Sequence, residues 1–174
     1  MTIRRLAPDD AALYRALRLR GLRESPGAFG TGAEEDERRT VGDFDEALRR
    51  NEESGVGFTL GAFDEGGGLV GVVGLHRDAR AKARHRAVVR GMFVAPEARR
   101  RGVGLALMQR LIVEARAMDG LERITLGVTT ASAAPLRLYE SLGFRPFGLE
   151  PRTLKIAGRY LDTHHMTLDL GGDY

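Results

Sequence analysis

The hydrophobic residues in the middle of the chain recur at helical spacing. Four of them lie three or four positions apart, so they share one face of a helix that can pack on a sheet: Leu105, Met108, Ile112 and Ala115. Gly120 ends the pattern, as glycine commonly does just beyond a helix. The pattern therefore predicts a helix that is buried along one side.

The first third of the chain predicts one strand followed by two helices. Thr2–Leu6 is typical of a strand, and Pro8–Asp10 is typical of a helix start. We expect this helix to end before Pro26, because Ser25–Gly30 is a loop that contains strong helix breakers. A second, polar helix is expected over Asp43–Asn51.

The remaining elements are mostly strands, and their order shows no internal repeat. A helix capped by Ser132 is expected to run through Leu142, and Gly143 suits the left-handed position at its end. The turn Glu65–Gly68 separates two strands, as in a hairpin. The strands expected are Gly57–Asp64, Leu69–His76, one that ends near Val94, Ile124–Val128, Phe144–Leu149 and Leu161–Leu170.

The segment Arg99–Gly104 has the properties of a phosphate-binding loop. It follows the apolar run Gly91–Val94 and opens the central helix, where backbone N–H groups lack intrahelical partners and the helix dipole carries about half a positive charge. Gly102 and Gly104 have no Cβ, so an anion can approach the main chain closely. Three consecutive arginines add charge and forked donors. The segment therefore predicts a site for a phosphate group.

The neighbouring sequence separates this loop from other phosphate motifs. A Walker loop needs Gly-Lys-Ser/Thr, and a dinucleotide fingerprint needs a glycine where Leu107 stands. The pattern Arg-x-x-Gly-x-Gly after Val94–Glu97 instead resembles the acetyl-CoA loop of the GNAT superfamily of N-acetyltransferases. Further along the chain, Ser132–Phe144 resembles the superfamily segment Asn-x-x-Ala-x-x-x-Tyr-x-x-x-Gly-Phe. The resemblance covers roughly Leu69–Leu170, and the first third matches only in outline.

This resemblance implies an α/β (α+β) fold with a mixed, largely antiparallel central sheet flanked by helices, and residues 1–174 as a single N-acetyltransferase domain. It implies that acetyl-CoA is the co-substrate and that the acetyl group passes directly to a primary amine in a ternary complex. The cofactor-binding residues it implies are Met92, Phe93 and Val94 along the pantetheine arm, then Arg99, Arg100, Arg101, Gly102, Val103, Gly104, Leu105 and Ser132. The first three can also be ordinary core residues, because backbone groups can bind while side chains pack.

Tyr139 is the catalytic residue that the resemblance implies. Its spacing from Leu136 and Leu142 also fits an aromatic member of a packed helix face. A tyrosine hydroxyl is protonated at neutral pH and can supply a proton to the departing CoA thiolate. Two positions depart from the superfamily pattern. Ser132 stands where Asn is usual and Pro135 where a small alanine is usual, and both residues are tolerated in a first helical turn.

The acceptor is expected to be a small cationic amine or a peptide terminus. The loop Arg23–Gly30 occupies the region that shapes the acceptor pocket in the superfamily, so Phe29 is a candidate pocket wall, or else a core plug between two helices. The acidic run Glu34–Glu37 lies close to this loop in sequence and can attract a cation. If it instead lies on an outer helix face, it is an ordinary solvated surface.

The general base is not evident from the sequence. His85 lies between two arginines, which disfavour its protonated form and make it a candidate at the substrate side; an exposed, uninvolved histidine is the alternative. Glu34, Glu35 and Glu150 are further candidates, acting directly or through water. The pair His164–His165 lacks the carboxylate or cysteine spacing of a metal site, so we expect in-strand packing and no metal.

Composition limits the remaining classes. The 174 residues include no cysteine, which excludes a cysteinyl acyl-enzyme and a zinc-thiolate site. The start of the chain lacks the apolar stretch of a signal peptide, and no run is long enough for a membrane span, so a cytoplasmic location is expected. The basic run Arg77–Arg101 has few aromatic residues, which argues against a nucleic-acid partner. A homodimer is possible, as is common in the superfamily. The rival function is a noncatalytic acyl-CoA-binding or regulatory module.

Overall fold

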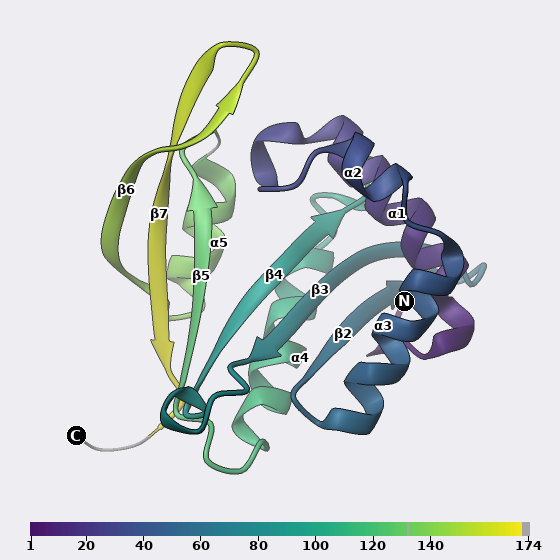
Figure 1. Ribbon diagram of the computed structural model, residues 1–174, viewed down its shortest axis with the longest axis horizontal. Coiled ribbons are helices and arrows are strands. Elements are labelled where there is room, and N and C mark those ends of the chain that lie inside the picture. Colours follow the sequence, from purple (N-terminus) through teal and green to yellow (C-terminus); the bar gives the residue numbers. More distant parts are fainter. Residues whose placement is uncertain (132, 172–174) are drawn as a thin grey trace.

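The computed structural model describes residues 1–131 and 133–171 and contains a seven-stranded sheet (Figure 1). The strand order is β1-β2-β3-β4-β5-β7-β6, and every neighbouring pair is antiparallel except β4 and β5, which are parallel. The strands are β1 (Thr2–Arg5), β2 (Gly57–Phe63), β3 (Leu69–Arg77), β4 (Arg86–Val94), β5 (Arg123–Thr129), β6 (Arg145–Ile156) and β7 (Arg159–Asp169). The expected mixed, largely antiparallel sheet flanked by helices is confirmed.

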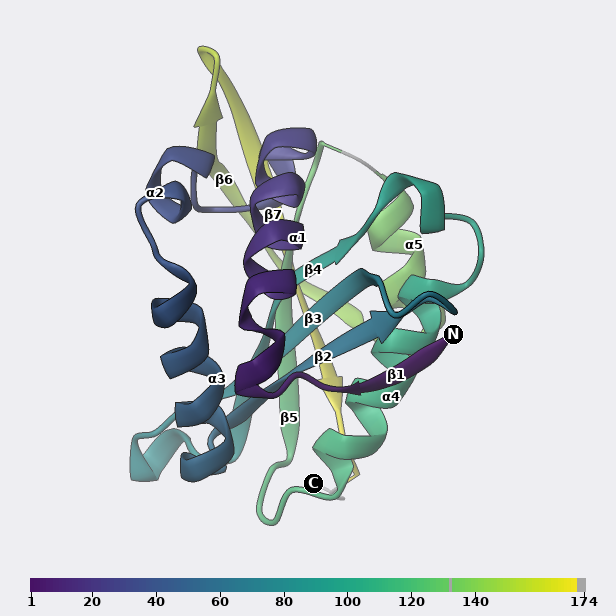
Figure 2. The ribbon, with the colours of Figure 1, turned by 90° about the vertical axis from the view of Figure 1, so that its right-hand side faces the viewer.

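Helices cover both faces of this sheet (Figure 2). One face carries α1 (Ala11–Glu24), α2 (Ala33–Glu37) and α3 (Val41–Ser54), and the other carries α4 (Val103–Arg116) and α5 (Ala133–Ser141). Short 3-10 turns lead into or link these elements: η1 (Pro8–Asp10), η2 (Pro26–Ala28), η3 (Ala81–Ala83) and η4 (Pro96–Ala98). Within the described residues, no helix combines the length and the apolar character needed to cross a membrane.

Two hydrophobic clusters hold the layers together. The larger one lies between the sheet and α4 and α5, and its fully buried members include Leu107, Met108 and Met166. The smaller one lies under α1 and α3 and includes Phe44 and Phe93. Burial of such side chains stabilises a fold by about 1.5–3 kcal/mol each. The predicted amphipathic helix is therefore real, although Leu105 lies at its margin and is 38% exposed.

The C-terminal strands are longer than their residue pattern indicates. β6 continues to Ile156, whereas the sequence pattern predicts an end at Leu149. Its register shifts between Glu150 and Leu154, and Arg152 takes a positive φ of 55° at that point. A bulge of this kind interrupts the alternation on which strand prediction depends. The short helix α2 was also not expected, because its run of acidic residues has no apolar periodicity.

Candidate active site

Strands β4 and β5 separate in the middle of the sheet. Their pairing is limited to three positions, from Arg86 opposite Arg123 to Val88 opposite Thr125. Beyond these pairs the two strands diverge (Figure 1), and β5 continues to pair with β7 alone within the described residues. Each strand therefore keeps main-chain groups along an edge that faces the gap. An extended ligand that contains amide groups can pair with such edges.

A β-bulge at Gly91 and Met92 shapes the β4 side of this gap. Val72 pairs with Phe93 and Gly74 with Arg90, so two β4 residues oppose one β3 residue. Gly91 has a φ of 66°, which glycine adopts without strain. The extra residue shifts by one position which β4 side chains face each side of the sheet. Met92 consequently packs toward α4, and Phe93 packs toward α1.

The three β4 residues predicted to follow the pantetheine arm have packed side chains. Phe93 is 6% exposed, and its ring lies 2.9 Å from the position that a Cβ on Gly21 would occupy. Met92 and Val94 are half-buried against the larger cluster. Packing of these side chains leaves the main chain of the segment as the candidate contact for a ligand in the gap. Its role in cofactor binding stays a prediction.

The loop before α4 has the geometry of an anion site. Gly102 caps α4 with a φ of 75°, and Arg100 also has a positive φ, of 59°. In the described part of the chain, the N–H groups of residues 102–105 have no protein acceptor, and the first helical bond runs from Ala106 N–H to Gly102 C=O at 2.9 Å. Four free donors at a positive helix end can bind a phosphate.

The arginines of this loop have different environments. Arg99 donates from Nε to the carbonyl oxygen of Val94 at 2.9 Å, and its guanidinium lies 5.6 Å from the Phe93 ring centre. It therefore ties the loop to the end of β4. Arg100 and Arg101 are exposed and make no ion pair or hydrogen bond within residues 1–131 and 133–171. These two side chains are free to reach an anion.

Gly104 lies where α4 comes closest to the gap. A Cβ at this position would be 3.2 Å from Met92 Cε and 3.6 Å from Leu138 Cδ2, so it would point between β4 and α5. At Gly102 nothing lies within 4 Å of the corresponding position, and only the positive φ favours glycine there. Glycine is therefore favoured at the two positions for different reasons: limited space at Gly104 and backbone conformation at Gly102.

Tyr139 is buried beneath the gap on α5. Its side chain is 6% exposed, and its ring meets Phe144 edge-on at 5.9 Å between ring centres. Burial raises the pKa of Tyr139 to about 12, so the hydroxyl remains protonated at neutral pH. No described residue bonds to the hydroxyl, yet no buried polar side-chain atom among those residues lacks a partner. The hydroxyl therefore keeps some contact with solvent and can donate a proton. Ser132, the predicted cap of this helix, lies outside the described residues.

The opposite wall of the gap comes from α1 and the loop that follows it. Phe29 is 9% exposed and lies 6.4 Å from the Phe93 ring, with the guanidinium of Arg18 stacked 4.8 Å above it. Arg18 Nε donates to Asp36 Oδ2 at 2.8 Å, and its Nη1 lies 3.8 Å from the position that a Cβ on Gly91 would occupy. Phe29 is thus a core residue that supports a charged group beside the bulge.

Two of the four acidic residues on α2 are neutralised by arginines. Asp36 is 4% exposed and pairs with both Arg18 and Arg39. Glu37 pairs with Arg23 at 2.6 Å. This arrangement weakens the basis for predicting a cationic acceptor, because a charge that is already paired attracts a ligand less.

The structure does not bring His85 to the gap. It precedes the first residue of β4, six positions before Gly91, and a strand advances about 3.3 Å per residue. His85 therefore lies at the end of the gap where β4 and β5 are still paired, which we call the closed end. At this rise per residue it is roughly 20 Å from the bulge. Its carbonyl oxygen accepts from the N–H groups of Glu122 and Arg123, at 2.8 and 3.0 Å, and anchors the start of β5.

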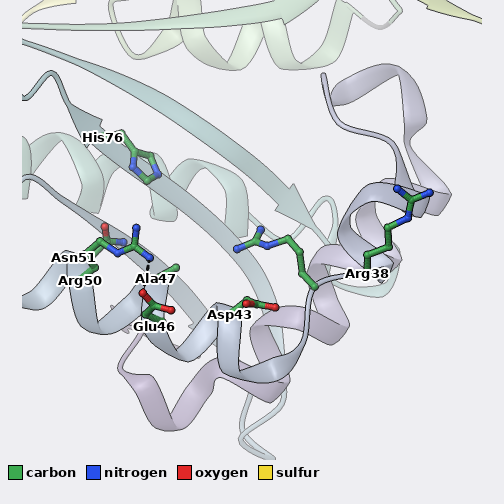
Figure 3. Close-up of a pocket in the computed structure, with 8 residues that line it drawn as sticks. Arg38, Asp43, Glu46, Ala47, Arg50, Asn51 and His76 are labelled. Carbon is green, nitrogen blue, oxygen red and sulfur yellow. Dashed lines mark hydrogen bonds and ion pairs between the residues drawn. The ribbon is translucent and has the colours of Figure 1, made fainter.

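An open groove of about 550 Å³ lies near the closed end of the gap, between α3 and β3 (Figure 3). His76 forms one side and pairs in the sheet with Val88, the residue at which β4 leaves β5. Desolvation and the nearby charge of Arg90 lower the pKa of His76. The remaining lining residues are mostly charged: Arg38, Arg39, Asp43, Glu46, Ala47, Arg50 and Asn51.

His164 and His165 point to opposite faces of β7. His164 pairs with Val128, which is buried against α4 and α5. His165 pairs with Gly127 on the opposite face of the sheet, which we call the open face because Gly127 is exposed there. Two residues on opposite faces cannot hold one metal ion. Among the residues that the structure describes, no three histidine or carboxylate side chains gather as a metal site. His165 Nε2 lies 2.8 Å from Glu150 Oε2, a contact that the sequence does not reveal because it depends on the β6 register.

Known proteins resemble both the sequence and the fold. A sequence model of the acetyltransferase (GNAT) family matches residues 19–144. An N-acetyltransferase of Streptomyces griseus is 38% identical over 81 residues, which are 47% of this chain and 41% of that protein. An L-amino acid N-acyltransferase of Escherichia coli is 35% identical over 83 residues, 48% of each protein. An L-methionine sulfoximine/L-methionine sulfone acetyltransferase of Pseudomonas aeruginosa matches with the same identity and coverage. The chain thus spans about half the length of the curated relatives it matches.

Solved structures match over nearly the whole chain. An acetyltransferase of the GNAT family from Streptococcus pneumoniae has a TM-score of 0.90 and 27% identity, and covers 97% of this chain and 98% of its own. A putative acetyltransferase from Salmonella typhimurium, solved with its cofactor acetyl-CoA, has a TM-score of 0.87 and 24% identity, and covers 100% of this chain and 96% of its own. At 24% identity, the similarity to the Salmonella typhimurium structure shows a shared fold only.

Proposed function

This chain belongs to the acetyltransferase (GNAT) family, and from that premise we propose that it transfers the acetyl group of acetyl-CoA to a primary amine. The observation that carries the proposal is the combination of a gap between β4 and β5 with four free N–H groups at the start of α4. The N–H groups suit the pyrophosphate of acetyl-CoA, and the strand edges suit the amides of its pantetheine arm. All seven strands belong to one sheet, which supports residues 1–174 as one acetyltransferase domain.

The chemistry needs no covalent enzyme intermediate. The amine nitrogen attacks the thioester carbonyl carbon, a C–N bond forms, and the C–S bond breaks. Tyr139 supplies a proton to the leaving sulfur, which its protonated state at neutral pH and its partly accessible hydroxyl support. The absence of cysteine from the sequence agrees with this direct route.

Two classes of acceptor fit different observations. The sequence predicts a small cationic amine or a peptide terminus, and the exposed Glu34 and Glu35 of α2 support that class. An amine that also carries a carboxylate, such as an L-amino acid, is supported by the relatives that act on L-amino acids and by Arg18. In the described region, the Nη atoms of Arg18 have no protein acceptor, although its Nε is bonded to Asp36. Forked guanidinium donors bind carboxylates well.

Release of free thiol from acetyl-CoA across a panel of amines tests this function. The panel contains a polyamine, a basic dipeptide, L-amino acids and a neutral primary amine. Acetyl transfer predicts release that depends on at least one amine, and kcat/KM ranks the two acceptor classes. Acetyl-CoA binding by calorimetry without thiol release for any amine would favour the rival binding module. Light scattering on the same sample distinguishes a monomer from a homodimer.

A further inference from the structure

A hydrogen-bonded histidine and glutamate lie on the open face of the β5–β7 half of the sheet. His165 on β7 and Glu150 on β6 are joined by the 2.8 Å contact between Nε2 and Oε2. Their side chains are 37% and 55% exposed. Phe147 lies beside the imidazole, with 6.0 Å between ring centres. A pair of this kind, a histidine held by a carboxylate, is a common arrangement for moving protons.

The strand register places His165 next to β5, on the face of the sheet opposite α4 and α5. Leu126 and Val128 are buried against α4 and α5, so Gly127 between them faces the other side of the sheet. His165 is the β7 partner of Gly127 and shares that side. A Cβ on Gly127 would lie 3.0 Å from Thr163 Cγ2 and 4.0 Å from His165 Nδ1. The Thr163 methyl group therefore occupies part of the space beside Gly127, and Gly127 itself is exposed on this face.

The hydrogen bond to Glu150 fixes which ring nitrogen is available. An ionised carboxylate can only accept, so Nε2 carries the proton in the neutral ring and Nδ1 keeps its lone pair. Nδ1 is the nitrogen on the Gly127 side, and no residue in the described ranges donates to it. His165 can therefore take up a proton at the atom that faces β5.

Few charged groups face His165 from its neighbours. From β6, Glu150 is in contact, and Arg145 stands on the same face opposite Thr167, two positions along β7. From β5, the facing residue is Gly127, and the next residues on that side, Thr125 and Thr129, are uncharged. Glu150 is thus the main partner of the imidazole and fixes its orientation.

We infer that His165, held by Glu150, is the general base that removes a proton from the acceptor amine, directly or through one water. This inference rests on the proposed function. An ammonium acceptor loses one proton to Nδ1, and its nitrogen lone pair then forms the C–N bond as the C–S bond breaks. The nitrogen releases its second proton to solvent, and Tyr139 protonates the leaving sulfur. Solvent afterwards restores neutral His165 and protonated Tyr139. His165 is a catalytic residue in this scheme, and Glu150 is a positioning residue.

The test compares His165→Asn with His164→Asn, because the second histidine is adjacent in sequence but points to the opposite face of β7. Each variant is assayed with two amines, one that is charged at neutral pH and one of low pKa that is already neutral. We expect His165→Asn to lower kcat/KM by about 10²-fold for the charged amine and much less for the neutral one. We also expect the acidic limb attributable to His165 to disappear from the pH profile. Glu150→Gln should lower kcat/KM for the charged amine more than for the neutral one, because Glu150 positions the imidazole.

Acetyl-CoA affinity and melting temperature are measured for every variant. Wild-type protein that releases no thiol with any amine would remove the proposed function itself. Active wild-type protein with an unchanged kcat/KM in His165→Asn would overturn the inference alone. So would an equal loss for both amines, because a merely structural role does not depend on the protonation of the acceptor. Loss confined to the charged amine, with unchanged acetyl-CoA affinity, supports His165 as the base.

Discussion

The two faces of the sheet are built in different ways. On the α4 and α5 face, the interior is a continuous apolar cluster, and the predicted cofactor loop is one contiguous segment attached to it. On the α1 and α3 face, charged pairs are buried beside a smaller apolar cluster, as with Asp36 and Arg18. Arg4 likewise holds Asp10 through two bonds of 2.6 and 2.8 Å and lowers the pKa of that carboxyl.

The α4 and α5 face carries the proposed cofactor site and is called the cofactor side. The α1 and α3 face carries the proposed acceptor site and is called the acceptor side. Apolar packing depends mainly on the size and spacing of the side chains, so a helix on the cofactor side needs only a matching apolar pattern. A buried ion pair needs both partners in register, and its members here come from distant elements.

The largest effect is expected on the acceptor side, at Asp36. Asp36→Ala leaves the guanidinium of Arg18 without its main partner, and the Arg18 side chain is only 16% exposed. Breaking a buried pair in this way costs about 3–5 kcal/mol of unfolding free energy. Urea denaturation of this variant measures it. Glu46→Ala is the control, since its ion pair with Arg50 is exposed and should matter little. Similar losses in both variants would contradict the contrast between the faces.

The next effect concerns Tyr139 and is confined to turnover. Tyr139→Phe keeps the ring against Phe144 and removes the proton donor, so kcat should fall by about 10²-fold with little change in KM. Because burial raises the pKa of Tyr139 to about 12, wild-type activity should show no alkaline decline from this group up to about pH 10. Steady-state kinetics across pH measure both. Unchanged turnover would reduce Tyr139 to a core residue.

A smaller effect is expected at Gly104. Gly104→Val should weaken acetyl-CoA binding about tenfold, because the new side chain would crowd Met92 and Leu138 at the mouth of the gap. Gly42→Val is a matched control. It also occupies the second position of a 14-residue helix, and its Cβ would meet only Thr40 Oγ1 at 3.5 Å. Calorimetry that finds equal affinities for the two variants would remove Gly104 from the cofactor site.

The smallest effect is expected from the exposed arginines of the loop. Arg101→Ala should weaken acetyl-CoA binding by about two- to fivefold at low salt, since exposed ion pairs contribute little. The difference from wild type should shrink as salt shortens the Debye length to about 8 Å or less. Binding titrations at two ionic strengths measure it. A loss that does not depend on salt would mean that Arg101 supports the loop structurally.

The same contrast explains what could be predicted from the sequence. Local sequence patterns predict the helix that begins after Gly102 and the helix that contains Tyr139. The structure has both helices, in the expected order. The divergence of β4 from β5 depends on long-range pairing and leaves no local pattern in the sequence. The cofactor side was therefore largely accessible to pattern reasoning.

The acceptor side was not accessible in this way. His85 was a candidate because two arginines flank it in sequence, but the length of β4 carries it to the closed end. The pairing of His165 with Glu150 follows from a β6 register that contains two shifts. The neutralisation of Asp36 requires α1 and α2 to pack together. None of these contacts leaves a periodic signal in the chain.

Transfer of an isotope-labelled acetyl group tests the central claim most directly. Wild-type protein is incubated with acetyl-labelled acetyl-CoA and the acceptor that gives the highest thiol release, and the amine is recovered and analysed by mass spectrometry. We expect label on the amine nitrogen in amounts equal to the thiol released, with both reduced in Tyr139→Phe. Thiol release without label on any amine, at the same rate in wild type and Tyr139→Phe, would contradict it.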